Sequence, residues 1–143
     1  MIAAIAVTAM LTQSPEQVIR EIQRSHIEGN VPPAADFDRL LSRDLEKYFS
    51  RLRRRSVKVQ AELLRDGPTQ SGVAYPRFYV WVRVLEGETV VEEGAARVAA
   101  IDRKEFDVTD YLDAPRIRAK AAVLYEVFPG AVADKIKARL GIK

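Results

Sequence analysis

The spacing of apolar residues changes twice along the chain. It follows a helical period over residues 15–28 and 35–54, and apolar and polar residues then alternate in stretches between 56 and 109. From residue 113 onward the spacing is helical again. This order predicts two N-terminal helices, four strands and two C-terminal helices.

The first helix has a well-marked start. Ser14 is an N-cap residue, Pro15 suits the first helical position, and Gln17 completes a capping box. The second helix presents an apolar stripe that requires burial against another layer. The stripe consists of Phe37, Leu40, Leu41, Leu45, Tyr48, Phe49 and Leu52. Within it, Ser42 followed by Asp44 is a point at which a second segment could begin.

A long β-hairpin is the clearest feature of the extended part. Its strands, 75–85 and 89–101, are joined by a short reversal that contains Gly87. Shorter strands are predicted at 56–64 and 105–109. Gly94, inside the hairpin, indicates a bulge or a close backbone approach, and the register stays open.

Strands that follow one another through short turns form a meander, and helices must cover one of its faces. We therefore predict an α+β fold in which N-terminal helices pack on a curved four-stranded antiparallel meander, followed by two C-terminal helices. Asp113 and Pro115 mark the start of the first of these helices, and Gly141 the end of the last. Residues 14–143 form a single domain in this interpretation.

This layout resembles the nuclear-transport-factor-2-like superfamily, in which N-terminal helices pack into the concave face of a curved sheet. The resemblance rests on the segments 37–45, 77–82, 96–101 and 106–111. It implies a fold with an internal cavity, and a cystatin-like helix and meander is the nearest alternative. Enzymes of the superfamily use acidic and tyrosine groups inside the cone, but no such constellation can be transferred to this chain residue by residue.

Composition excludes several kinds of site. The chain has no cysteine and one histidine, His26, so thiolate and histidine-cluster metal sites are not expected. Dinucleotide, P-loop, nucleophile-elbow and HExxH motifs do not occur in the sequence, and we expect no cofactor. The net charge of +3 gives little reason to expect nucleic-acid binding.

The N-terminal residues 1–13 are apolar but too short to span a bilayer, so no transmembrane segment is predicted. They fit the remnant of a secretory signal, with Val7-Thr8-Ala9 as the cleavage site, or a first strand or helical turn packed on the domain. An exported and a cytoplasmic location both stay open.

Five polar residues are candidates for a ligand pocket between the second helix and the sheet. They are His26, Tyr48, Glu93, Arg97 and Asp107. Each also has a structural interpretation: Tyr48 fills a core, and Glu93 and Arg97, four apart on one strand face, join cross-strand charge pairs with Arg83 or Arg77. In the functional interpretation, Arg97 holds a ligand carboxylate.

Three residues on the other face of the hairpin are interface candidates: Tyr79, Trp81 and Arg83. Our leading hypothesis is a non-enzymatic binding or accessory module for a small apolar or acidic ligand or for a protein partner, including a homodimer through this face. A small acid/base enzyme of the isomerase or hydrolase type is the second hypothesis. A weak nucleic-acid binder using the basic residues between Arg51 and Lys58 is the third.

Overall fold

The computed structural model describes residues 13–143, so the expectations for the N-terminal apolar segment lie almost entirely outside the described part. The N-terminal helices are α2 (Pro15–Asn30) and α3 (Ala34–Arg53). The strands are β1 (Lys58–Leu63), β2 (Arg77–Glu86), β3 (Thr89–Ile101) and β4 (Glu105–Asp113). The C-terminal elements are α4 (Ala114–Ala119), η1 (Ala121–Val123), α5 (Leu124–Val127) and α6 (Gly130–Arg139). The predicted α+β fold with an antiparallel meander is confirmed.

The sheet has the order β1-β2-β3-β4, and every neighbouring pair is antiparallel. Gly94 lies between Val82 of β2 and Asp113 of β4. A Cβ atom at this position would come within 2.5 Å of the Leu112 carbonyl oxygen. Of the two roles predicted for Gly94, the close backbone approach is therefore the correct one.

β4 is longer than the predicted strand 105–109. Its pairing with β3 shifts between Arg97 and Val98, so that Arg97 lies opposite Asp110 and Val98 opposite Val108. The extra residue, Thr109, is a β-bulge, which interrupts the alternation of side chains. The apolar period therefore ends at Thr109 although the strand continues.

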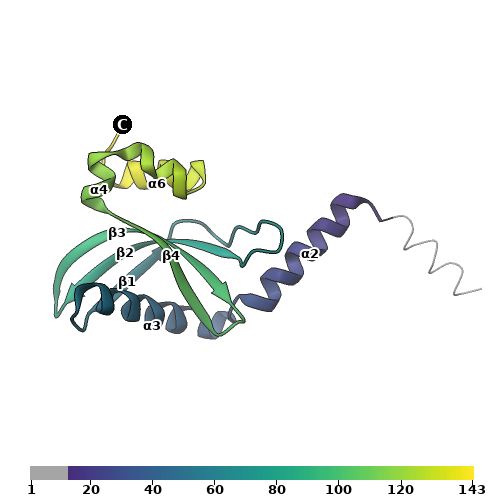
Figure 1. The fold of residues 1–143 in the computed structure, drawn as a ribbon, viewed down its shortest axis with the longest axis horizontal. Coiled ribbons are helices and arrows are strands. Elements are labelled where there is room, and N and C mark those ends of the chain that lie inside the picture. Colours follow the sequence, from purple (N-terminus) through teal and green to yellow (C-terminus); the bar gives the residue numbers. More distant parts are fainter. Residues whose placement is uncertain (1–12) are drawn as a thin grey trace, which may run out of the picture.

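One face of the sheet packs on α3. Leu45 and Phe49 of this helix are fully buried against the sheet, in a core that includes Val80 and Val82 of β2. Figure 1 shows α3 running beneath the strands as one continuous helix. The break considered at Ser42 is absent because both halves of the stripe meet the same sheet face.

The opposite face is covered by the C-terminal helices (Figure 1). Tyr79 and Trp81 are only 4% and 3% exposed, and they share a core with Leu124 and Ile136. The prediction that these two aromatic residues face a partner is therefore wrong. The chain's own C-terminal helices bury them, so that the molecule has three layers.

The first predicted C-terminal helix is divided into α4, η1 and α5. Lys120 interrupts it with a φ of −151° and a ψ of 82°, which are not helical angles. The predicted start is confirmed, because the Asp113 side chain accepts a hydrogen bond from the Arg116 amide. Short segments let the chain fold back over the sheet face.

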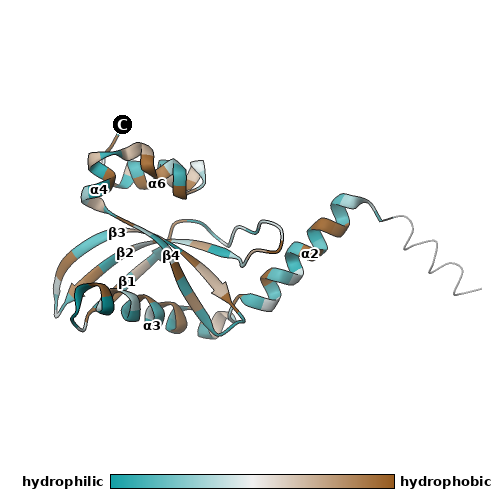
Figure 2. Ribbon diagram, viewed as in Figure 1, coloured by the Kyte–Doolittle hydropathy of each residue, from teal (hydrophilic) through white to brown (hydrophobic). Residues whose placement is uncertain are grey.

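α2 leaves the body of the molecule, as Figure 1 shows, and the helix stripe of Val18, Ile19 and Ile22 stays 41–54% exposed. Figure 2 shows apolar residues interrupting the polar surface of this helix. The predicted capping box at Ser14 and Gln17 is confirmed. Of the two N-terminal helices, only α3 therefore packs on the sheet.

Between residues 13 and 143, no helix has the length and apolar content needed to cross a bilayer.

Candidate functional site

An apolar groove opens where α3 begins and β1 ends. Leu63, the last residue of β1, pairs with Val80, so its side chain lies on the face of the sheet that α3 covers. It nevertheless remains 41% exposed. The reason is that α3 starts only at Ala34, after Pro32-Pro33, and α2 turns away from the sheet. This end of the core face is left without a helix above it.

We call this feature the α3–β1 groove. Its apolar wall consists of Val31, Pro32, Ala34, Phe37, Leu63 and Phe78. The loop after β1 contributes Asp66, Gly67 and Pro68, and α3 adds Asp38. The groove is shallow and largely open to solvent, and its volume of about 460 Å³ lies within the range of about 300–1,000 Å³ that is usual for ligand sites.

Local contacts hold both walls in place. The Arg65 guanidinium donates to the carbonyl oxygens of Gly67 and Pro68, at 2.9 and 2.7 Å, and so fixes the loop. On the other side, the Phe37 and Phe78 rings meet edge to face with their centroids 5.0 Å apart. The groove is therefore formed by side chains that have defined packing partners.

A second, smaller hollow lies between α3 and β4. It brings together two of the predicted pocket residues, Tyr48 and Asp107, with Lys47 and Arg51 beside them. Its volume is about 220 Å³, below the usual range for ligand sites. Its lining includes both cations and carboxylates, so it offers no field of one sign.

Deeper between α3 and β3, a group of ionisable residues surrounds Glu92. The Arg53 guanidinium donates to the Glu92 carboxylate at 2.8 Å. Burial raises the pKa of Tyr111, and the nearby Glu92 carboxylate raises it further. Burial, together with the charges of Glu92 and Asp110, also raises the pKa of Tyr48. Both hydroxyls therefore stay protonated at neutral pH, and the Glu92 carboxylate shares the Arg53 guanidinium with Glu86.

The remaining candidates lie elsewhere. Arg97 is on the sheet face beneath the C-terminal helices, where it pairs with Asp110 and donates to the Val127 carbonyl oxygen at 3.3 Å. Glu93 forms the predicted cross-strand pair with Arg83, at 3.1 Å. Arg97 and Glu93 thus have protein partners, and the structure does not bring them to the groove or to the α3–β4 hollow.

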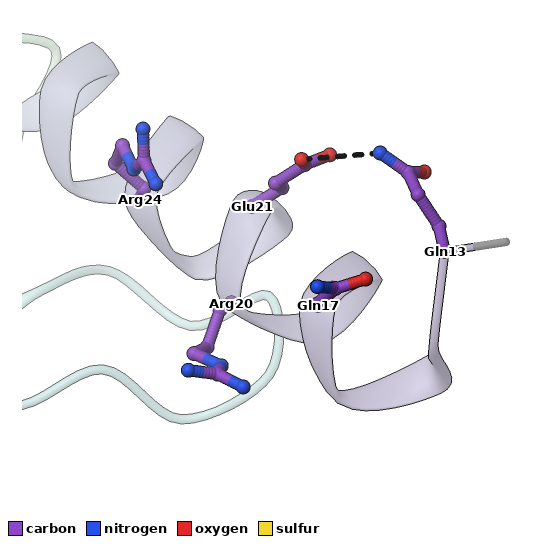
Figure 3. Close-up of a pocket in the computed structure, with 5 residues that line it drawn as sticks. All are labelled: Gln13, Gln17, Arg20, Glu21 and Arg24. Carbon is purple, nitrogen blue, oxygen red and sulfur yellow. Dashed lines mark hydrogen bonds between the residues drawn. The ribbon is translucent and has the colours of Figure 1, made fainter. Parts of the chain in front are cut away.

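A further hollow runs along α2. Its lining residues are Gln13, Gln17, Arg20, Glu21 and Arg24. As Figure 3 shows, these side chains extend from α2 or from Gln13, two residues before it, and the Gln13 amide donates a hydrogen bond to Glu21. A ligand site needs walls from more than one element, so we do not regard this hollow as a site. His26 is also carried by α2, and within residues 13–143 no group of three metal-ligating side chains comes together.

The residues that define the groove are not among the predicted site residues. Leu63 continues the alternation of β1, and Phe37 continues the stripe of α3, so both are read from the sequence as ordinary core residues. Asp38 and Asp66 resemble any exposed acidic residue. The groove residues are accessible because α2 points away from the sheet and does not cover them. The sequence pattern contains no signal for the direction of α2.

Comparisons with protein-family models, with curated proteins and with solved structures find no match to this chain. The resemblance to the nuclear-transport-factor-2-like superfamily therefore stays a prediction.

Proposed function

We propose that this chain is a non-enzymatic binding module whose ligand site is the α3–β1 groove. The observation that supports the proposal is Leu63, a core-facing residue on the sheet that is 41% exposed. Exposed apolar side chains that gather in a concave surface commonly mark a binding site. The groove provides an apolar wall and carboxylates at its edge.

An uncharged fluorescent naphthylamine, such as N-phenyl-1-naphthylamine, tests the proposal directly. We expect its emission to rise on binding to the wild-type protein. The substitution Leu63→Gln removes an apolar wall residue and should weaken binding by about tenfold, because burying a leucine contributes about 1.5–3 kcal/mol.

Leu52→Gln is the matched control. Leu52 is 56% exposed, more than Leu63, but it lies near the C-terminal end of α3 and does not line the groove. Its substitution should leave binding unchanged. An absence of binding to the wild-type protein, or equal losses in both variants, would contradict the proposal.

A further inference from the structure

The charged residues that line the α3–β1 groove all have one sign. Asp38 of α3 and Asp66 of the loop after β1 both contribute to the lining, which contains no lysine, arginine or histidine. The two aspartates lie on different walls of the groove. Any ligand that occupies the apolar part is therefore close to carboxylates from more than one direction.

These carboxylates are not neutralised by the protein. In the described residues, neither Asp38 nor Asp66 takes part in an ion pair within 4.0 Å, whereas the neighbouring Asp36 pairs with Arg39 at 3.1 Å. Arg65, next to Asp66 in the chain, donates instead to loop carbonyl oxygens. Two negative charges are thus available to a ligand at the edge of an apolar surface.

An aromatic ring in the same groove favours the same sign of charge. Phe37 and Phe78 both line it, but Phe78 is only 4% exposed, so the half-buried Phe37 is the ring that a ligand can reach. The face of a phenyl ring attracts a cation that lies within about 6 Å of its centre. A cationic group between carboxylates and aromatic rings is the arrangement used in the recognition of quaternary ammonium compounds.

From this arrangement we infer that the ligand of the α3–β1 groove is an amphiphile with an apolar chain and a cationic head group. Its apolar chain lies against Leu63 and the aliphatic part of the lining, and its cationic head group lies near Phe37, Asp38 and Asp66. This inference rests on the proposed function and specifies the ligand class of the same site. The protein as a whole carries a net charge of +3, so its overall electrostatic field would attract anions rather than this cationic head group.

Three ligands that share the same apolar chain but differ in head-group charge distinguish the proposed function from the proposed ligand class. Isothermal titration would measure the binding of dodecyltrimethylammonium, dodecyl maltoside and dodecyl sulfate, each kept below its micelle concentration. We expect the ammonium compound to bind about tenfold more tightly than the maltoside at low salt, and the sulfate to bind most weakly. If none of the three binds, the proposed function fails. If all three bind with the same affinity, or the sulfate binds best, only the present inference fails.

Substitution of the aspartates locates the effect. The double variant Asp38→Asn with Asp66→Asn should lose the preference for the ammonium compound over dodecyl maltoside. Asp36→Asn is the control, since Asp36 lies in the first turn of α3 without lining the groove. A preference for the ammonium compound that survives in the double variant would overturn the assignment.

Discussion

At the scale of single residues, Tyr111 combines burial with an unused polar group. Its hydroxyl is buried beside the Glu92 carboxylate, but the contact between the two does not reach hydrogen-bond geometry. A buried polar group without a partner costs about 1–3 kcal/mol of the free energy of unfolding. The ring itself is useful, because it packs edge to face on Phe49 with the centroids 4.7 Å apart.

We therefore expect Tyr111→Phe to raise the free energy of unfolding at pH 7 by about 1 kcal/mol, because it keeps the ring and removes the hydroxyl. The variant should also resist alkali better. Burial raises the pKa of Tyr111 in the folded state, whereas the unfolded residue loses its proton near pH 10. Stability is thus lost as the pH rises above about 10, and the phenylalanine variant lacks this loss.

Urea unfolding at pH 7 and at about pH 10.5 measures both effects. Tyr75→Phe serves as the control, since Tyr75 is 47% exposed and its variant should match the wild type at both pH values. A lower stability of Tyr111→Phe at pH 7 would show that the hydroxyl has a stabilising partner.

At the scale of elements, the turn between β3 and β4 is held by both N-terminal helices. The Asn30 side chain at the end of α2 accepts a hydrogen bond from the Asp102 amide at 3.0 Å. From α3, Asp44 accepts one from the Phe106 amide at 2.7 Å. These contacts hold a three-residue connection, Asp102 to Lys104, in which Asp102 and Arg103 have φ values of 53° and 63°, the region that the central residues of type I′ turns require.

Arg103→Gly should raise the free energy of unfolding by about 0.5–1 kcal/mol. A non-glycine residue in the left-handed region costs about 1–2 kcal/mol, and the greater freedom of glycine in the unfolded chain takes back about 0.5–1 kcal/mol. Thermal unfolding measures the difference.

The converse substitution, Gly87→Ala, provides the control. Gly87 has a φ of 63°, and an added Cβ atom would meet no atom within 4 Å. The free energy of unfolding of the Gly87→Ala variant should therefore fall by about 1 kcal/mol through backbone strain alone. Equal effects of both substitutions, with the same sign, would rule out the backbone explanation.

Elements defined by neighbouring residues could be predicted from the sequence. The capping box at Ser14 and the N-cap at Asp113 depend only on contacts three residues apart, and both are present in the structure. The end of β4 could not be predicted, because the bulge at Thr109 depends on pairing with β3. The interruption at Lys120 was also missed, since the apolar spacing of the segment continues across it.

At the scale of the whole molecule, the sequence predicted the meander but not what covers it. The alternation in β2 places Val80 and Trp81 on opposite faces, which shows that two surfaces need burial. It contains no information on whether a partner or the C-terminal helices bury the second surface. The position of α2 could not be predicted for the same reason. An apolar stripe on a helix has the same sequence whether or not another layer packs against it.

The shared strands make a prediction about cooperativity. One core lies between α3 and the sheet, and the other lies between the sheet and the C-terminal helices. Both take alternate residues from β2 and β3, so neither core can unfold without disturbing the other. Trp81 is the only tryptophan and lies in the second core, where its emission reports local packing.

Leu45→Ala empties space in the core beneath α3, on the sheet face opposite Trp81, and should cost about 2–5 kcal/mol. Because the strands are shared, we expect it to lower the unfolding midpoint measured by Trp81 emission about as much as Ile136→Ala, a substitution in the core that contains Trp81. Calorimetry of each variant should show one transition at the same midpoint. A Trp81 midpoint that responds to Ile136→Ala but not to Leu45→Ala would instead mean that the C-terminal layer unfolds separately, and that the aromatic face of β2 can open while the rest of the sheet stays folded.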